Sequence, residues 1–205
     1  PDLFAAYEDE RRHVGARVRL GSARHAAIRR DVAKGYDPIV SQDSDEGRAK
    51  RLEYGEYILE LGNLENEAWG IEWGYRYDTS PVIVHEDGEA PPYEWETVEP
   101  STWPGVRAPN VFLPSGEAIH DLFGKGFTLV HFGVESCDAF VRAAQQRSVP
   151  LEVVRIDDPH AASIYEQPFA LIRPDQHVAW RGAVIPEADD VALILDTVRG
   201  VAPRL

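Results

Sequence analysis

Short apolar runs alternate with amphipathic stretches through the C-terminal part of this chain, and their order limits the fold more than any other feature. Runs rich in branched and aromatic residues predict four strands, at 127–132, 151–156, 169–173 and 178–181. Helical spacing predicts helices at 137–147, 160–165 and 188–201. The turn 174–177 joins the last two strands. The β-α-β-α-β-β-α order predicts an α/β domain with helices packed on a sheet.

The N-terminal part begins with one long helix, predicted over residues 3–34. Its apolar residues recur every three, four or seven positions, at Leu3, Tyr7, Val14, Val18, Ala26 (or His25), Ile28 and Val32. Gly35 follows as a stop signal. A narrow apolar stripe on one helix needs a partner surface, so we expect this helix to brace another domain.

The middle of the chain predicts a small α+β segment and then a connector. A helix with Asp43, Ser44 and Asp45 as cap candidates ends at Leu61–Gly62. Alternating apolar residues predict a strand from Ile71 to Tyr77, and 82–84 predicts a second, short strand. Residues 87–109 hold prolines at positions 91, 92, 100, 104 and 109, which is typical of an extended connector. We therefore expect a boundary near Pro104, between residues 1–104 and a thioredoxin-like domain at 105–205.

The charge of the chain excludes some partners. The formal net charge is −14, and residues 35–100 are the most acidic stretch, which argues against nucleic acid and anionic membranes. No apolar run is long enough for a membrane span, and no secretory signal is visible. A single cysteine is typical of a reducing compartment, so we expect a cytoplasmic protein. The lack of methionine and the start at Pro1 favour a piece of a longer polypeptide.

Three stretches together resemble the C-terminal part of FAD-dependent aromatic-ring monooxygenases of the phenol and polyketide type. The first is Leu3-Phe4-Ala5-Ala6-Tyr7-Glu8-Asp9-Glu10-Arg11-Arg12, in which His13 follows where many relatives have proline. The second is Gly74-Tyr75-Arg76-Tyr77 with Ser80-Pro81 and, later, Pro104-Gly105-Val106-Arg107-Ala108-Pro109. The third runs from Asp121-Leu122-Phe123-Gly124 to Arg173-Pro174-Asp175-Gln176-His177 and Trp180-Arg181-Gly182.

This resemblance implies a parent enzyme that uses FAD and NAD(P)H to hydroxylate an aromatic small molecule. Residues 1–104 would then be the end of the flavin and substrate domain, and residues 105–205 its appended thioredoxin-like domain. Partners would be the missing N-terminal FAD domain and, as an option, a second copy of the chain. No Gly-x-Gly-x-x-Gly turn occurs here, so we expect this chain alone to bind no cofactor and to be inactive. We assign it no catalytic, cofactor-binding or metal residue; its histidines lack ligand spacing.

Cys137 is the one candidate for a redox role. It sits where thioredoxin-like redox proteins place the first cysteine of a Cys-x-x-Cys pair, at the start of a helix. Phe140 occupies the resolving position, so a disulfide cannot close within the chain, and a packing role is the simpler interpretation. A stand-alone thioredoxin-like binding or redox module centred on Cys137 remains the alternative. Gln167-Pro168 lies where such folds carry a cis-proline, and either isomer is open there.

The aromatic run between 69 and 77 also has two interpretations. Trp69, Trp73, Tyr75 and Tyr77 would line an aromatic-substrate cavity or, more simply, pack a strand against the missing flavin domain.

Overall fold

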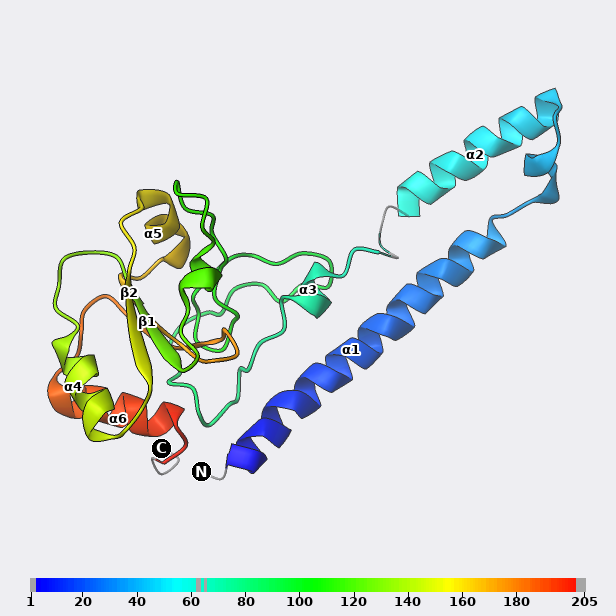
Figure 1. Cartoon of the computed structure of the whole chain (residues 1–205). Helices are drawn as coiled ribbons and strands as arrows, with labels where there is room; N and C mark the ends of the chain where they lie inside the picture. Colours follow the sequence, from blue (N-terminus) through cyan, green and yellow to red (C-terminus); the bar gives the residue numbers. More distant parts are fainter. Residues whose placement is uncertain (1–2, 62–63, 65, 202–205) are drawn as a thin grey trace. The chain divides into compact units, whose positions relative to one another are not determined.

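The computed structural model describes residues 3–61, 64 and 66–201 (Figure 1). It is a mixed α/β structure whose described part contains one four-stranded sheet and six α-helices. The α-helices are α1 (Leu3–Lys34), α2 (Asp45–Leu61), α3 (Trp69–Glu72), α4 (Asp138–Gln146), α5 (Pro159–Tyr165) and α6 (Ala188–Val198). The strands are β1 (Phe127–His131), β2 (Leu151–Arg155), β3 (Phe169–Ile172) and β4 (Val178–Gly182). Two short 3₁₀ helices cover Pro38–Ser41 and Ile119–Leu122.

The sheet has the strand order β2-β1-β3-β4. Strand β1 pairs in parallel with β2 and antiparallel with β3, and β3 pairs antiparallel with β4. The β3–β4 hairpin turns through Gln176, whose φ of 70° is left-handed, while the amide of Arg173 donates to the carbonyl of His177 at 2.8 Å. The predicted order of strands and helices in the C-terminal part is confirmed, with ends that differ by up to three residues.

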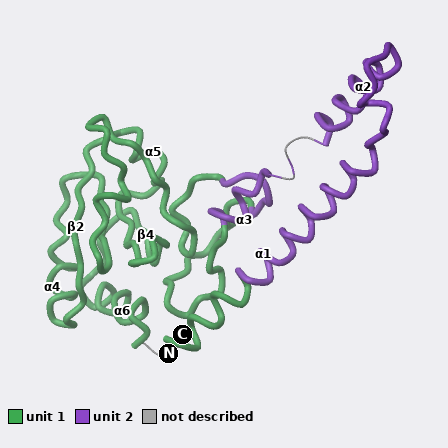
Figure 2. The backbone as a smooth tube through the Cα atoms, turned by 45° about the vertical axis from the view of Figure 1, so that its right-hand side comes forward, with its two compact units in different colours: residues 1–13, 75–92, 99–205 green, residues 14–74, 93–98 purple. Residues whose placement is uncertain are grey.

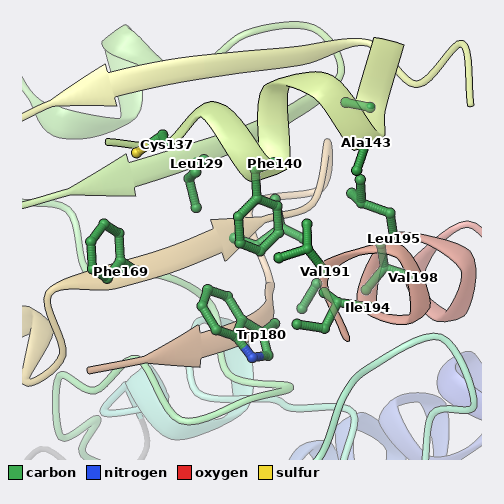
Figure 3. Packing of buried hydrophobic residues seen from close by; sticks show 13 residues of the cluster. Leu129, Cys137, Phe140, Ala143, Phe169, Trp180, Val191, Ile194, Leu195 and Val198 are labelled. Carbon is green, nitrogen blue, oxygen red and sulfur yellow. The ribbon is translucent and has the colours of Figure 1, made fainter. Parts of the chain in front are cut away.

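Both faces of the sheet are covered by apolar side chains. Helices α4 and α6 pack on one face, where Phe140 lies against Trp180 with ring centroids 5.2 Å apart (Figure 3). Helix α5 and the chain before β1 cover the other face, where the fully buried Tyr165 and Ile119 pack with Ile172. Alternate residues of each strand serve opposite faces, which is why the strands read as nearly continuous apolar runs.

The structure divides into two compact units (Figure 2). The first contains Pro1–His13, Tyr75–Pro92 and Glu99–Leu205, and the second contains Val14–Gly74 and Tyr93–Val98. The sheet and both of its cores lie in the first unit. Residues 75–92 and 99–104 therefore belong to the same unit as the sheet. The predicted boundary near Pro104 is a statement about which part folds independently, and it stays a prediction.

In the second unit, α2 returns along the C-terminal end of α1 (Figure 1). The hydroxyls of Tyr54 and Tyr57 donate to the carbonyls of Val32 and Asp31, at 3.0 and 3.1 Å, and so satisfy the last carbonyls of α1. A Cβ at Gly35 would lie 2.6 Å from the Tyr57 ring, so the glycine permits this close approach. The Ser44 hydroxyl caps α2, as predicted; Gly62, at the other predicted end, lies outside the described residues.

The predicted strand Ile71–Tyr77 is wrong. Residues 69–72 form helix α3, and the amides of Ile71 and Trp73 donate to the carbonyls of Ala68 and Trp69 at 2.9 and 2.8 Å. These local hydrogen bonds satisfy the backbone without a neighbouring strand. Gly70 is required here, because a Cβ would collide with the carbonyl of Glu94.

The predicted strand at 82–84 is also wrong. Val82 and Ile83 are consecutive and both buried, so the side chains do not alternate as a strand requires. Only one ladder-like bond is made, from the Val84 amide to the Ala179 carbonyl at 2.8 Å. This hydrogen bond holds the irregular segment at residues 82–84 beside β4.

One further expectation is corrected, and one open question is answered. In α1, Leu3, Tyr7 and Val18 are exposed, while Ala6 and Glu10 are buried together with Val14, so the buried row contains a carboxylate. The open question at Pro168 is resolved as trans, because no cis peptide bond occurs among the described residues. Glu166, two residues earlier, has a left-handed φ of 63°.

We predict that Phe140→Ala lowers the free energy of unfolding by about 3–5 kcal/mol, because it empties a fully buried site between α4 and Trp180. Phe112→Ala is the matched control, since Phe112 is 75% exposed, and we expect a change within about 0.5 kcal/mol. Denaturant unfolding measures both variants. Equal losses would contradict the described core.

Candidate functional site

Cys137 lies directly before α4 and is buried, with 8% of its surface exposed. Burial raises the pKa of its thiol, and the nearby carboxylates of Asp138 and Glu135 raise it further. A helix N-terminus would stabilise a thiolate, and burial and the two carboxylates oppose that effect here. Phe140, one turn later, is fully buried against Trp180. The surroundings of Cys137 therefore favour a protonated, unreactive thiol.

The three sequence stretches that carry the family resemblance meet in one polar cluster of the first unit. Glu10 and Arg11 come from the start of α1, Tyr75 and Tyr77 from the segment after α3, and Arg173, Asp175 and His177 from the β3–β4 hairpin. We call this set, with Ser80, the Glu10–Arg173 cluster.

A bidentate ion pair forms the centre of the cluster. Two guanidinium nitrogens of Arg173 donate to the two carboxylate oxygens of Glu10, at 2.5 and 3.0 Å. The Ser80 hydroxyl donates to the same carboxylate at 2.5 Å. The side chains of Arg173 and Glu10 are 14% and 3% exposed, so both charges are largely removed from water. Such a pair is stable only while both partners are present.

Aromatic rings enclose one side of the ion pair. The ring centroids of Tyr77 and His177 are 4.3 Å apart. The guanidinium carbon of Arg173 lies 5.2 Å from the Tyr77 ring centroid. Arg11 donates to the Tyr77 hydroxyl at 3.4 Å. Burial raises the pKa of Tyr77, so the phenol stays protonated. The uncharged Tyr77 ring covers the Arg173 guanidinium, and its hydroxyl accepts a hydrogen bond from Arg11.

The hairpin holds its own charge network. Asp175 accepts a hydrogen bond from Arg173 at 2.9 Å and from the His177 amide at 3.3 Å. Burial opposes ionisation of Asp175, but the hydrogen bond with His177 and the charge of Arg173 outweigh it and lower the carboxyl pKa to about 2. The His177 side chain is fully buried, and its Nε2 has no hydrogen-bond partner among the described residues.

A second polar group fixes the irregular segment beside β4. Arg181 donates to both oxygens of Glu86, at 3.1 Å each from its Nε, and also contacts Glu166. The ring of Trp103 lies 5.2 Å from its guanidinium carbon. The Ser101 hydroxyl donates to Glu166 at 3.0 Å. These contacts tie Glu86 and residues 101–103 to the end of the sheet without regular secondary structure.

The helix starts near the sheet do not fit the pyrophosphate of FAD. Such a group is normally received by a glycine-rich turn and the positive end of a helix. Here Glu135 and Asp138 stand at the start of α4, Asp158 caps α5, and Asp189 and Asp190 lie in the first turn of α6. Each of these starts would repel a phosphate. Among the described residues, no group of three or more His, Cys, Asp or Glu is placed to hold a metal ion.

Comparisons with known proteins agree with the motifs that meet in the cluster. Residues 101–202 match the family model described as aromatic-ring hydroxylase, C-terminal. The FAD-dependent monooxygenase opdD of Penicillium oxalicum is 30% identical over 203 residues, covering 94% of this chain and 38% of opdD. A solved structure of RebC-10x, native and with bound K252c, has a TM-score of 0.81 and 35% identity, over 98% of this chain and 38% of that one. The flavin-dependent monooxygenase PieE, solved with FAD and substrate, has a TM-score of 0.79 and 26% identity, over 98% and 40% of the two chains.

These matches define the class as the C-terminal region of flavin-dependent monooxygenases. Residues 101–202 belong to the aromatic-ring hydroxylase C-terminal family, as the motifs indicated. It spans somewhat over a third of the length of the relatives that it matches, 38% in the case of opdD. No helix in the described ranges is both long and apolar enough to cross a membrane.

Sequence reasoning placed Glu10, Tyr77 and Arg173 in family motifs but did not predict that they meet. The sequence around Glu10 or Arg173 contains no local pattern that predicts an ion pair between positions 163 residues apart. The available signal was a glutamate within the otherwise apolar row of α1, since a carboxylate on a buried helix face requires a partner.

We predict that Glu10→Gln lowers the free energy of unfolding by about 3–5 kcal/mol, because it leaves the buried Arg173 without its counter-charge. Glu8→Gln is the matched control on the same helix. Glu8 pairs with Arg12 at the surface, so we expect a loss below about 1 kcal/mol. Chemical denaturation checks both; an unchanged midpoint for Glu10→Gln would contradict the assigned pair.

Proposed function

We propose that this chain is the C-terminal part of an FAD- and NAD(P)H-dependent monooxygenase that hydroxylates an aromatic, phenol-like or polyketide ring. The observation that carries the proposal is the match of residues 101–202 to the aromatic-ring hydroxylase C-terminal domain, with a relative such as opdD aligned along 94% of the chain. FAD would supply the oxygen chemistry of the parent enzyme from a preceding domain.

Within that enzyme we assign this chain a structural role without catalytic residues. The Glu10–Arg173 cluster supports this role, because it joins the first turns of α1 to the β3–β4 hairpin inside one compact unit. Residues 105–205 are proposed as a thioredoxin-like domain, supported by the β2-β1-β3-β4 order with its parallel β1–β2 pair. Its partners would be the N-terminal FAD domain and a second copy of the chain, in the cytoplasm and away from nucleic acid or membranes.

A stand-alone redox module centred on Cys137 is the second candidate, and two observations weigh against it. Burial raises the pKa of the Cys137 thiol. Phe140 fills the resolving position and has no exposed surface. Thiol–disulfide exchange requires an accessible thiolate, which this site disfavours.

The test uses the polypeptide that extends upstream of Pro1. We expect its added sequence to carry a Gly-x-Gly-x-x-Gly turn, and the purified protein to retain FAD and to oxidise NAD(P)H with a phenol and oxygen. The 205-residue chain alone should purify without colour. Flavin absorbance of the short chain after desalting, or a longer polypeptide that binds no flavin, would overturn the proposal.

For Cys137, we predict that Cys137→Ser leaves the hydroxylation rate of the longer enzyme within about twofold, since a protonated buried thiol takes no part in turnover. Stability should fall by about 1 kcal/mol, because the side chain packs as a small hydrophobic group. Steady-state turnover and melting temperature are measured beside Ser136→Ala as control. A rate loss above about tenfold with unchanged melting would favour the redox role.

A further inference from the structure

A cavity of about 620 Å³ opens between the irregular segment 78–85 and helix α6 in the first unit. Its volume lies in the range of small-molecule sites, roughly 300–1,000 Å³. It lies away from the Cys137 position, and the Glu10–Arg173 cluster touches it only through Ser80, whose hydroxyl is already bound to Glu10.

The floor of the cavity is apolar and aromatic. Trp180 of β4 lines it together with Val84, Leu193 and Ile194. Leu193 is 42% exposed, so part of its aliphatic side chain is left uncovered. A flat apolar ring would cover Trp180 and these aliphatic groups together.

Trp180 also presents an unused hydrogen-bond donor. Only 8% of its surface is exposed, and its indole N–H has no hydrogen-bond partner among the described residues. Figure 3 shows the indole nitrogen on the side of the ring that faces away from Phe140. Because Trp180 lines the cavity, that donor is available to an acceptor inside it.

Carboxylates are the most numerous ionisable groups on the cavity walls. Asp9, Asp78 and Asp190 contribute them, and neither lysine nor arginine lines the space. The lining also includes His85, whose Nε2 lies 2.9 Å from the Ser80 carbonyl oxygen.

Asp78 is paired with Arg76, at 2.8 Å, whereas Asp190 has no ion-pair partner in the described part of the chain. Asp190 lies four residues before Ile194 on α6, so the two positions are about 6 Å apart along the helix axis.

We propose that this cavity binds a small aromatic amine that also carries an oxygen acceptor. The ring covers Trp180 and Ile194, the ammonium group meets Asp190, and the oxygen accepts from the Trp180 indole. Asp190, which has no ion-pair partner among the described residues, disfavours an anionic ligand. The site requires no flavin, and its existence does not depend on the activity proposed for the parent enzyme.

The test titrates the 205-residue chain with tyramine and follows its indole N–H signals by NMR. Of the five tryptophans, Trp180 is identified by the signal that disappears in Trp180→Phe. We expect saturable movement of that signal. Tyrosol, which replaces the ammonium by a hydroxyl, should bind about tenfold more weakly, as should phenethylamine, which lacks the phenolic oxygen.

Two neighbouring carboxylates provide matched variants. Asp190→Asn should weaken tyramine binding about tenfold, whereas Asp189→Asn, in the same turn but outside the cavity, should leave it within about twofold. Both variants lose one charge from the start of α6, so a general effect on folding would be shared. Equal effects of the two variants, equal binding of tyrosol, or a static Trp180 signal would each overturn the proposal.

Discussion

The ion pair between Glu10 and Arg173 is the constraint on which the rest of the first unit depends. Two charges buried to this extent are tolerated only in a geometry that satisfies both, and here each carboxylate oxygen receives a guanidinium nitrogen. The pair therefore fixes the rotation of the first turns of α1 about the helix axis. It also fixes the β3–β4 hairpin, because Arg173 begins the turn and its guanidinium also donates to Asp175 within the turn.

Irregular chain at residues 75–92 and 99–104 belongs to the same unit. Its backbone makes few ladder bonds, so side chains of the ordered elements hold it in place. Arg181 binds Glu86, and the Thr102 hydroxyl contacts the Tyr165 carbonyl, at the two ends of the segment beside β4. Gly105 closes it with a φ of 95°, a left-handed conformation in which its amide donates to Val178 at 2.8 Å. Prolines are compatible with this path, since such chain needs few backbone donors.

Sequence reasoning succeeded where the signal is local and failed where it is not. Cap candidates predicted α2, and runs of branched and aromatic residues predicted the four strands. Helical spacing predicted α1 and the C-terminal helices, because apolar spacing reports which face is buried. The same rule failed at Ile71–Tyr77, where alternation occurs without a neighbouring strand to take the backbone hydrogen bonds. In α1 it selected exposed Leu3 and Tyr7 over buried Glu10, whose partner lies 163 residues away. The cluster was foreseen only as separate motifs, since an ion pair between distant positions leaves no local pattern.

At the start of α4, a side chain at position 140 can either pack in the core or serve as a resolving thiol, and Phe140 packs in the core. A fully buried phenylalanine contributes roughly 1.5–3 kcal/mol by leaving water, and Phe140 adds a ring contact with Trp180. A resolving cysteine at this position would forfeit most of that contribution and would have to emerge from the core to react. Because Phe140 supports one face of Trp180, it also holds the indole in place at the cavity beside α6. Phe140, which occupies the resolving position, thus also supports the Trp180 ring that lines this cavity.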